Sequence, residues 1–148
     1  MIFFTTLRKI KNTTILIYII IIVNIVLLNT SFAFQEWTKV AIGNNGHTFF
    51  VDMMKIIEKK KYIYFWQLIN YIKPDEYGDY SAKIYIQADC KKFKFRWNKV
   101  SYHKLFMAKD KVKATIPSKA VEGWQYPRPN TTSFAVLDYV CKNMGVLL

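Results

Sequence analysis

The chain has 148 residues, a formal net charge of +12 at pH 7, and a composition that is 52% hydrophobic and 17% aromatic. This length leaves room for one domain of ordinary size and excludes a protein of several domains. The sequence has two cysteines without a Cys-x-x-Cys motif and two histidines. This pattern excludes a zinc site with the usual Cys and His spacing.

The N-terminal segment has the three-part pattern of a secretory signal peptide. Its first eleven residues carry three basic residues and no acid, an apolar run occupies residues 15–28, and the small residues Ser31 and Ala33 follow. A basic start, an apolar core and small residues before a cleavage site are typical of exported proteins. We therefore expect residues 1–33 to be a signal peptide that is cleaved after Ala33, and residues 34–148 to form the exported domain.

An uncleaved membrane anchor is the competing interpretation of this segment. The apolar run of fourteen residues is shorter than the roughly 20 residues that a helix needs to span a bilayer. A buried core helix is a third interpretation, but this run has no polar face to present to water. Cleavage is therefore the interpretation we favour, and membrane contact is expected only through the N-terminal segment before cleavage.

The exported domain is strongly basic. Removing residues 1–33 takes away three of the 22 basic residues and none of the 10 acidic ones, so the domain keeps a net charge of +9. Outside the cytoplasm this charge favours anionic partners such as lipid headgroups, lipopolysaccharide, acidic glycans or acidic proteins. A basic surface that serves solubility alone is the alternative. Nucleic acid is not an expected partner, because export takes the chain away from it.

Cys90 and Cys141 are the two cysteines of the chain. An even number of cysteines in an exported domain predicts a disulfide. Closing a loop of this length stabilises a fold by about 4 kcal/mol in the chain-entropy model. Two unpaired buried thiols are the alternative.

The first half of the domain has the pattern of antiparallel strands. Residues 37–42 and 47–52 flank the turn sequence GNNG at 43–46, which predicts a hairpin. Residues 61–72 are rich in Tyr, Ile, Phe and Trp and predict a long strand. Residues 74–79 predict a turn.

Residues 83–97 predict a second hairpin with one apolar face. If paired residues have numbers that sum to 181, the apolar residues of both strands share that face. The pairs are then Ala88 with Phe93, Ile86 with Phe95, and Ile84 with Trp97. The other face carries polar residues, as in a sheet that is covered on one side only. A slip by one residue would bury the basic residues of the second strand, so the pattern also fixes the register.

Lys92, Lys94 and Arg96 alternate with the aromatic residues of this hairpin. In the predicted register, rings and charges point to opposite faces, whereas a stacking platform for nucleic acid needs both on one surface. We therefore interpret the aromatic residues as core. The three basic residues form a solvated row with little apolar cover, which is the candidate site for an anionic ligand.

Residues after this hairpin lead to a C-terminal helix. Residues 100–106 predict a further extended segment, and a lysine-rich connection over 108–123 follows it. Residues 124–129 contain two prolines, which exclude a helix interior and predict an extended lead-in. Asn130 or Thr131 is then placed to cap a helix over about 131–144.

The predicted helix can cover the apolar face of the sheet. Its apolar residues recur at spacings of three and four and form one stripe. This stripe consists of Phe134, Leu137, Cys141 and Met144, with Val140 beside it. Because Cys90 falls in the hairpin loop, a disulfide to Cys141 would tie the helix to the end of the sheet. The predicted fold class is α+β, with a single antiparallel sheet of about six strands and a C-terminal helix packed on one face.

The sequence offers little catalytic chemistry. His47 and His103 lie in extended segments without the neighbouring Cys or acid that a metal site or a triad would need. Asp75, Glu76 and Asp79 lack calcium-loop spacing and indicate a solvated turn. The motifs of nucleotide-binding proteins and serine hydrolases are missing. We therefore expect a non-enzymatic protein with no cofactor and no metal.

Residues characteristic of one protein family are spread over 37–141. They are Trp37, Phe50-Val51-Asp52, Trp66, Ile84-Tyr85-Ile86, Asp89-Cys90, Arg96, Trp124 and Tyr139-Val140-Cys141. In this pattern the chain resembles the bacterial surface-adhesin protein E family, and the Asp-Cys and Val-Cys pairs are the most specific part. The resemblance implies one antiparallel sheet with a C-terminal helix, the Cys90–Cys141 disulfide, and binding to host or surface macromolecules.

The predicted function is that of an exported, non-enzymatic binding or adhesin-like module in the periplasm or at the cell surface. Its expected partners are host or envelope macromolecules, and its expected anion contacts are Lys92, Lys94 and Arg96. The alternative is an envelope enzyme or accessory protein with a site of ordinary polar residues that includes His103. A pocket that holds His103 beside an acid would favour this alternative.

Cleavage after Ala33 predicts a mature protein that begins at Phe34. The intact mass of protein from a periplasmic extract should therefore correspond to residues 34–148. The mass of the whole 148-residue chain would instead identify the N-terminal segment as an uncleaved anchor.

Overall fold

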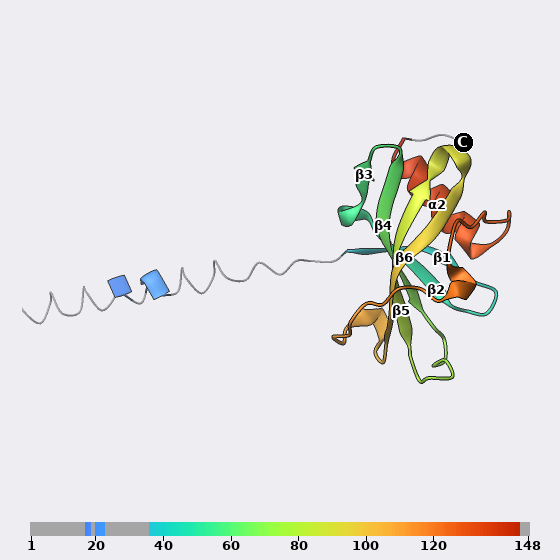
Figure 1. The fold of residues 1–148 in the computed structure, drawn as a ribbon. Coiled ribbons are helices and arrows are strands. Elements are labelled where there is room, and N and C mark those ends of the chain that lie inside the picture. Colours follow the sequence, from blue (N-terminus) through green and yellow to red (C-terminus); the bar gives the residue numbers. More distant parts are fainter. Residues whose placement is uncertain (1–16, 19, 23–35, 146–148) are drawn as a thin grey trace, which may run out of the picture. The chain divides into compact units, whose positions relative to one another are not determined.

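The structure is a computed structural model, and it describes residues 17, 18, 20–22 and 36–145 (Figure 1). The chain divides into two compact units, residues 1–34 and 35–148. In the first unit the described residues are helical and exposed. The predicted cleavage site and most of the predicted signal peptide lie outside the described residues, so cleavage stays a prediction.

Among the residues that the structure describes, no helix has the length and apolar character needed to cross a membrane.

The second unit is built on a six-stranded antiparallel sheet with one α-helix (Figure 1). The strands lie in the order β1-β2-β4-β5-β6, and β3 pairs with β4. Their bounds are β1 (Trp37–Ile42), β2 (Thr48–Asp52), β3 (Ile57–Lys59), β4 (Tyr62–Asn70), β5 (Ser81–Asp89) and β6 (Lys94–His103). The helix is α2 (Thr132–Asn143). The predicted α+β fold is confirmed.

Four short 3-10 turns interrupt the connections between these elements. They are η1 (Met53–Lys55), η2 (Cys90–Lys92), η3 (Phe106–Ala108) and η4 (Lys119–Val121). The short strand β3 and the turn η1 were not predicted, because neither is long enough to show a periodic pattern.

The first hairpin forms where the sequence predicts it. β1 and β2 pair across the turn that contains Gly43 and Gly46, whose positive φ of 81° suits a glycine. The register shifts between Lys39 and Ala41. This bulge explains why hydrophobic and polar residues alternate imperfectly along β1, because one extra residue reverses the faces on which side chains lie.

The second hairpin has a longer loop than predicted. Asp89 pairs with Lys94 and Ala88 pairs with Phe95, so the predicted partner Phe93 lies two residues away. The reason is local: the Asp89 carboxylate accepts a hydrogen bond from the backbone N–H of Lys92 at 3.2 Å, and Phe93 adopts φ 44°. The four-residue loop that results shifts the register by an even number, so the inward and outward faces stay as predicted.

One face of the sheet, the inner face, packs against α2. The buried core joins apolar residues of β2, β4, β5 and β6 to those of the helix. Its members are Val51, Ile63, Phe65, Ile84, Ile86, Ala88, Cys90, Phe95, Val100, Val136, Leu137, Val140 and Cys141. Phe93, Phe134, Trp97 and Met144 pack around it or on each other. The predicted aromatic core and helix stripe are thus confirmed, with Val136 added.

The N-terminus of α2 is capped as predicted. The Thr131 hydroxyl accepts a hydrogen bond from the backbone N–H of Phe134 at 3.2 Å. Such a cap satisfies one of the unpaired backbone donors in the first turn and stabilises a helix by about 1 kcal/mol.

The disulfide joins this helix to the sheet. Cys90 lies in η2 at the end of β5, Cys141 lies in the last turns of α2, and the two Cα atoms are 5.7 Å apart. Both residues are almost fully buried. The predicted pairing is confirmed, and the predicted tie between the hairpin loop and the helix is found.

The opposite side of the sheet, the outer face, is covered over one half by residues 104–110. This segment contains η3 and is held by side chains of the sheet: Ser81 donates to the Leu105 carbonyl at 2.7 Å, and the backbone N–H of Met107 donates to the Asn70 side chain at 2.9 Å. Met107 and Ala108 both have positive φ, which non-glycine residues adopt only where surrounding contacts require it. Within the described part of the chain, no such segment is bonded across the other half of the outer face.

Loss of the disulfide should destabilise the domain and release α2 first. A Cys90→Ala/Cys141→Ala variant opens the loop that the disulfide closes between residues 51 positions apart. The chain-entropy model gives a loss of about 4 kcal/mol in the free energy of unfolding. Urea unfolding followed by circular dichroism measures this loss, and hydrogen exchange should show amides of α2 opening before those of β4 and β5. Equal stability of the variant and the oxidised protein would contradict the predicted role of the disulfide.

Candidate functional site

The uncovered half of the outer face collects aromatic rings and basic side chains. Alternation along the strands places these residues opposite to the core residues on either side of them. They are Trp37, Tyr62, Tyr64, Trp66, Lys83, Tyr85, Lys94, Arg96, Trp124 and Tyr126, which we call the cation–aromatic face. All ten are half-buried or exposed.

The backbone of Gln125 places the two C-terminal rings of this face. Gln125 forms an antiparallel bridge with Phe95 through two hydrogen bonds of 3.0 and 2.7 Å. Residues opposite each other in a bridge direct their side chains to the same face, and Phe95 points into the core. Trp124 and Tyr126, one residue to either side of Gln125, therefore lie on the outer face beside β6.

A first cationic centre is formed around Trp124. The Lys94 Nζ atom lies 4.4 Å from the centroid of the Trp124 ring, and the Arg96 guanidinium carbon lies 5.1 Å from it. Tyr62 stacks on the same indole, with a centroid distance of 5.6 Å, and Lys94 Nζ is 5.8 Å from the Tyr126 ring. These are distances at which a cation is attracted by the negative face of an aromatic ring.

A second cationic centre is formed by Lys83 on β5. Its Nζ atom lies 4.7 Å from the centroid of Trp66 and 5.8 Å from that of Trp37. Partial burial lowers the pKa of Lys83, the charge of Lys55 lowers it further, and Asp52 acts in the opposite direction. The rings thus hold a cation that has given up part of its hydration.

Tyr85 and Gln87 fill the space between the two centres. The Tyr85 ring lies 6.0 Å from that of Tyr64 and 4.9 Å from that of Trp66. Gln87 is buried, and its side-chain oxygen accepts a hydrogen bond from Arg96 Nε at 2.9 Å. This bond orients the guanidinium group toward the sheet and the adjacent indole.

The predicted basic row is only partly formed. Lys94 and Arg96 do lie on one face of β6, but Lys92 lies in η2 and is exposed beyond the end of the strand. The expectation of little apolar cover is wrong, because Trp124 packs over both strand cations. Sequence reasoning missed this ring, since Trp124 reaches β6 through a bridge between residues 30 positions apart.

None of the ion pairs in the described residues includes a cation of this face. The four pairs are Lys55–Asp52, His103–Asp110, Lys104–Asp79 and Lys142–Asp138. Two buried acids do lie beside the face: Asp52 acts on the charge of Lys83, and Asp89 is paired with Lys94 across β5 and β6. The accessible part of the face therefore presents positive charge and aromatic rings.

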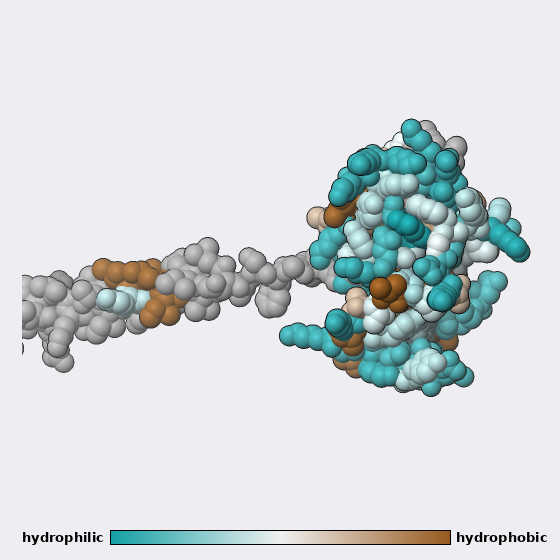
Figure 2. Space-filling view, viewed as in Figure 1, coloured by the Kyte–Doolittle hydropathy of each residue, from teal (hydrophilic) through white to brown (hydrophobic). Residues whose placement is uncertain are grey.

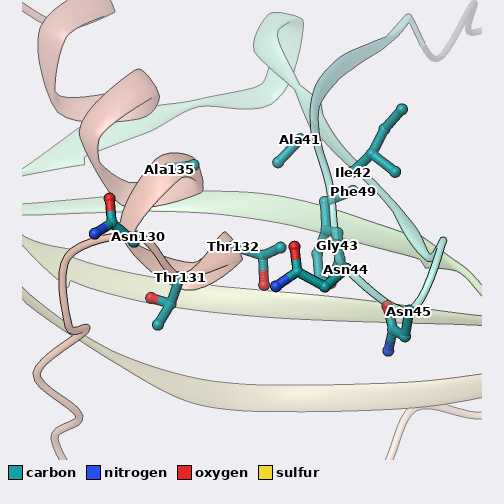
Figure 3. Close-up of a pocket in the computed structure, with 10 residues that line it drawn as sticks. All are labelled: Ala41, Ile42, Gly43, Asn44, Asn45, Phe49, Asn130, Thr131, Thr132 and Ala135. Atoms are coloured by element: carbon teal, nitrogen blue, oxygen red, sulfur yellow. The ribbon is translucent and has the colours of Figure 1, made fainter.

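A separate cleft lies where the β1–β2 turn meets the start of α2 (Figure 3). Its volume is ≈ 580 Å³. Phe49, Ala41 and Ala135 form apolar parts of the lining. Side-chain amides and hydroxyls form the rest, from Asn44, Asn45, Asn130, Thr131 and Thr132. The cleft carries no ionisable side chain, so it contributes nothing to the basic surface.

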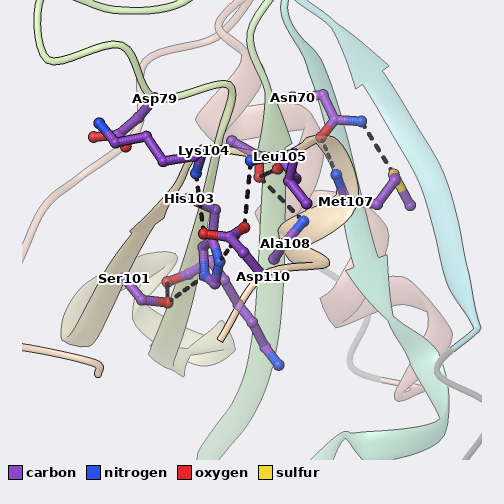
Figure 4. Close-up of polar contacts among 11 residues, drawn as sticks. Asn70, Asp79, Ser101, His103, Lys104, Leu105, Met107, Ala108 and Asp110 are labelled. Carbon is purple, nitrogen blue, oxygen red and sulfur yellow. Dashed lines mark hydrogen bonds and ion pairs between the residues drawn. The ribbon is translucent and has the colours of Figure 1, made fainter. Parts of the chain in front are cut away.

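His103 is the centre of a polar network beneath residues 104–110 (Figure 4). Its Nε2 atom lies 2.9 Å from the Ser101 hydroxyl, and its Nδ1 atom lies 3.2 Å from a carboxylate oxygen of Asp110. This is the order of groups in a serine-hydrolase triad. Ser101 and His103 are only 6% and 4% exposed, however, and a nucleophile must reach its substrate. The geometry therefore favours a structural network. The enzyme alternative predicted an acid beside His103, and Asp110 is one, but the Ser101 hydroxyl is not accessible to a substrate.

His47 likewise has a local structural role. Its Nδ1 atom accepts a hydrogen bond from the backbone N–H of Ile72 at 3.2 Å, and its ring lies 5.1 Å from that of Tyr71. In the turn that follows, the Asp75 carboxylate accepts backbone N–H bonds from Tyr77 and Asp79. These residues stabilise turns, as the sequence indicates for the acids.

A family model for surface-adhesin protein E matches residues 37–142. The chain belongs to the surface-adhesin protein E family. This confirms the resemblance, and membership supports an adhesin-like surface protein that binds host or surface molecules. No protein among those with curated descriptions matches the chain.

Solved structures of Haemophilus influenzae protein E have a similar fold. Crystal form II has a TM-score of 0.55 and 16% identity, and the match covers 74% of this chain and 89% of that one. A second structure of the protein gives 0.55 and 16%, with 76% and 88% covered. Its selenomethionine form gives 0.53 and 15%, with 72% and 86% covered. At this identity the likeness shows the fold of the family and no more.

Asp110 is the anchor through which this family member holds residues 104–110 to β6. Partial burial acts to raise the pKa of Asp110, but hydrogen bonds from backbone N–H groups, those of Lys104, Asp110 itself and Leu105, outweigh it. The neighbouring His103 acts in the same direction, and the pKa of Asp110 lies below its ordinary value. The carboxylate is thus stabilised in its charged form by the segment that it holds.

Replacing Asp110 by Asn should therefore destabilise the protein in a pH-dependent way. A carboxyl whose pKa is depressed by folding stabilises the folded state above the ordinary Asp pKa of about 3.9 and loses this effect as the pH falls through the lower folded value. Thermal unfolding should show a lower Tm for Asp110→Asn at pH 7, and the two Tm values should converge below about pH 4. Asp138→Asn, which breaks the exposed pair on α2, is the control and should change Tm little. Identical curves for Asp110→Asn and the unaltered protein would refute this role.

Proposed function

We propose that this chain is an exported, non-enzymatic binding module of the cell envelope, and that its cation–aromatic face contacts anionic or proteinaceous ligands at a cell or host surface. The placement of Lys94 and Arg96 over the Trp124 ring, 4.4 and 5.1 Å from its centroid, is the observation that carries the proposal. Family membership supports the adhesin-like character.

The composition of the face supports macromolecular binding. Aromatic residues and arginine are the residue types that carry most of the energy of protein interfaces, because they bury large areas at low entropic cost. The cations add long-range attraction for an anionic partner and raise the rate of encounter. On the side of residues 36–145 seen in Figure 2, strongly hydrophobic residues form small separate spots among hydrophilic ones. Charge and rings are therefore the means of recognition that we propose for this face.

The buried Ser101–His103 pair supports a non-enzymatic role, since its hydroxyl is held inside the sheet rather than offered to a substrate. The exported location that we propose rests on the N-terminal pattern in the sequence and on the adhesin family. Periplasm and cell surface are both compatible with these observations.

A Lys94→Gln/Arg96→Gln variant should bind heparin or lipopolysaccharide roughly ten- to thirtyfold more weakly, at ~1 kcal/mol for each charge removed. Its Tm should fall by several degrees, because the variant loses cation–ring contacts of about 0.5–1 kcal/mol each and the Arg96–Gln87 hydrogen bond, worth about 1 kcal/mol. Lys92→Gln should weaken binding less, since Lys92 lies beyond the strand. Titration calorimetry measures the affinities of both variants, and thermal unfolding measures the Tm.

A Lys73→Gln/Lys142→Gln variant is the matched control for charge. Both side chains are exposed and lie away from the cation–aromatic face, Lys73 after β4 and Lys142 on α2. This control loses the same formal charge and should keep its binding. If it binds as weakly as the Lys94→Gln/Arg96→Gln variant, net charge alone governs binding and the proposed face is wrong.

A further inference from the structure

We infer that the ligand of the cation–aromatic face is an acidic polysaccharide, whose acidic groups meet the two cationic centres while its sugar rings lie over the aromatic side chains at these centres and between them. This inference rests on the proposed function and specifies its ligand. It follows from the spacing of the centres, the absence of their cations from the described ion pairs and the way in which the rings are paired.

The spacing of the two centres points to an extended ligand. Lys83 and Gln87 are four residues apart on β5, and Arg96 is bonded to Gln87 from the adjacent strand. At ~3.3 Å per residue the two centres are about 13 Å apart along the strands. A single small anion cannot reach both centres, whereas a chain with repeated acidic groups can.

The charge of the face favours an anionic ligand. Within the described residues no ion pair includes Lys83, Lys94 or Arg96, and the acids beside them, Asp52 and Asp89, are buried. A second copy that docked through the same face would set these three cations against their own copies, which is unfavourable. The partner that we infer is therefore a different molecule that supplies the negative charge.

The aromatic rings between the two cationic centres favour a polysaccharide as the ligand. Tyr85 lies there, next to Trp66 of the second centre, and the two rings are tilted by 38° with their centroids 4.9 Å apart. A polysaccharide carries apolar C–H faces on its rings as well as carboxylate or sulfate groups, so it can use both components of this surface. An inorganic polyanion can use only the cations.

The pairing of the rings disfavours single-stranded nucleic acid. Tyr62 already stacks on Trp124, and Tyr64 on Tyr85, both at an interplanar angle of 27°. A base would compete with these neighbours for a stacking plane, whereas sugar C–H groups can contact ring edges and tilted faces. The sequence-based reason against nucleic acid holds for Phe95 and Trp97, which lie on the face opposite Lys94 and Arg96, but rings from other segments, such as Trp124 and Tyr62, do share the basic face. The ring geometry supports the same preference on other grounds.

Tyr126 provides the sharpest test, because its side chain is 66% exposed and lies 5.8 Å from the Lys94 ammonium group. We expect Tyr126→Ala to bind a size-defined heparin oligosaccharide roughly fivefold more weakly, the loss of one ring contact, with unchanged binding of inorganic polyphosphate. Tyr126→Phe keeps the ring and should bind both probes as the unaltered protein does. Tyr77→Ala removes a tyrosine that is 74% exposed in the loop before β5 and is the matched control.

Each other outcome overturns the inference. If Tyr126→Ala leaves oligosaccharide binding unchanged, or weakens the binding of both probes equally, the aromatic rings do not bind the sugar. If a single-stranded oligonucleotide of equal charge binds more tightly than the oligosaccharide and is the probe that loses affinity in Tyr126→Ala, nucleic acid is the ligand. The Lys94→Gln/Arg96→Gln variant separates the two proposals: if it binds polyphosphate and oligosaccharide normally, the proposed face itself fails, whatever Tyr126 does.

Discussion

Burial of one face of the sheet beneath a single helix is the constraint on which the rest of this structure depends. The apolar side chains of β2, β4, β5 and β6 need cover on one side, and Val136, Leu137 and Val140 of α2 provide it. The helix is only twelve residues long, so the Cys90–Cys141 disulfide adds a covalent hold at its C-terminal end. Because no second helix covers the other side in the described residues, the outer face must be solvated, covered by loops or used for binding.

The two halves of the outer face, which no helix covers in the described residues, differ in how they are shielded from water. Residues 104–110 cover one half and bring their own polar groups, which pair with Ser81, Asn70 and His103 so that few donors are left without partners. The other half keeps its rings half-buried and sets cations above them. A lysine can rest its alkyl chain on an aromatic surface while its ammonium group stays in water, so this half is soluble and still rich in contact area.

The hydrogen-bond geometry around His103 resembles a catalytic site, but the burial of its serine does not fit catalysis. Ser101, His103 and Asp110 are arranged within hydrogen-bond distance in the order of a catalytic triad. The same bonds hold a strained segment against the sheet, and burial closes the serine to substrate. The similar fold of Haemophilus influenzae protein E at 16% identity shows that the scaffold tolerates wide change in its side chains. The chemistry of the exposed half must therefore be derived from this chain's own residues.

The hairpins, the helix with its cap, the disulfide and the place of Phe95 in the core could all be predicted from the amino-acid sequence. Each of these follows from local periodicity, from turn residues or from the count of cysteines in an exported domain. The register of the second hairpin differs from the predicted one for a local reason, the hydrogen bond from the backbone N–H of Lys92 to the Asp89 carboxylate. The character of the cation–aromatic face depends on tertiary structure, since Trp124 comes from a segment without periodicity and reaches Lys94 and Arg96 only through a bridge to β6. Contacts between residues far apart in the chain leave no pattern in a single sequence, because their energy depends on where the whole fold brings the two segments together.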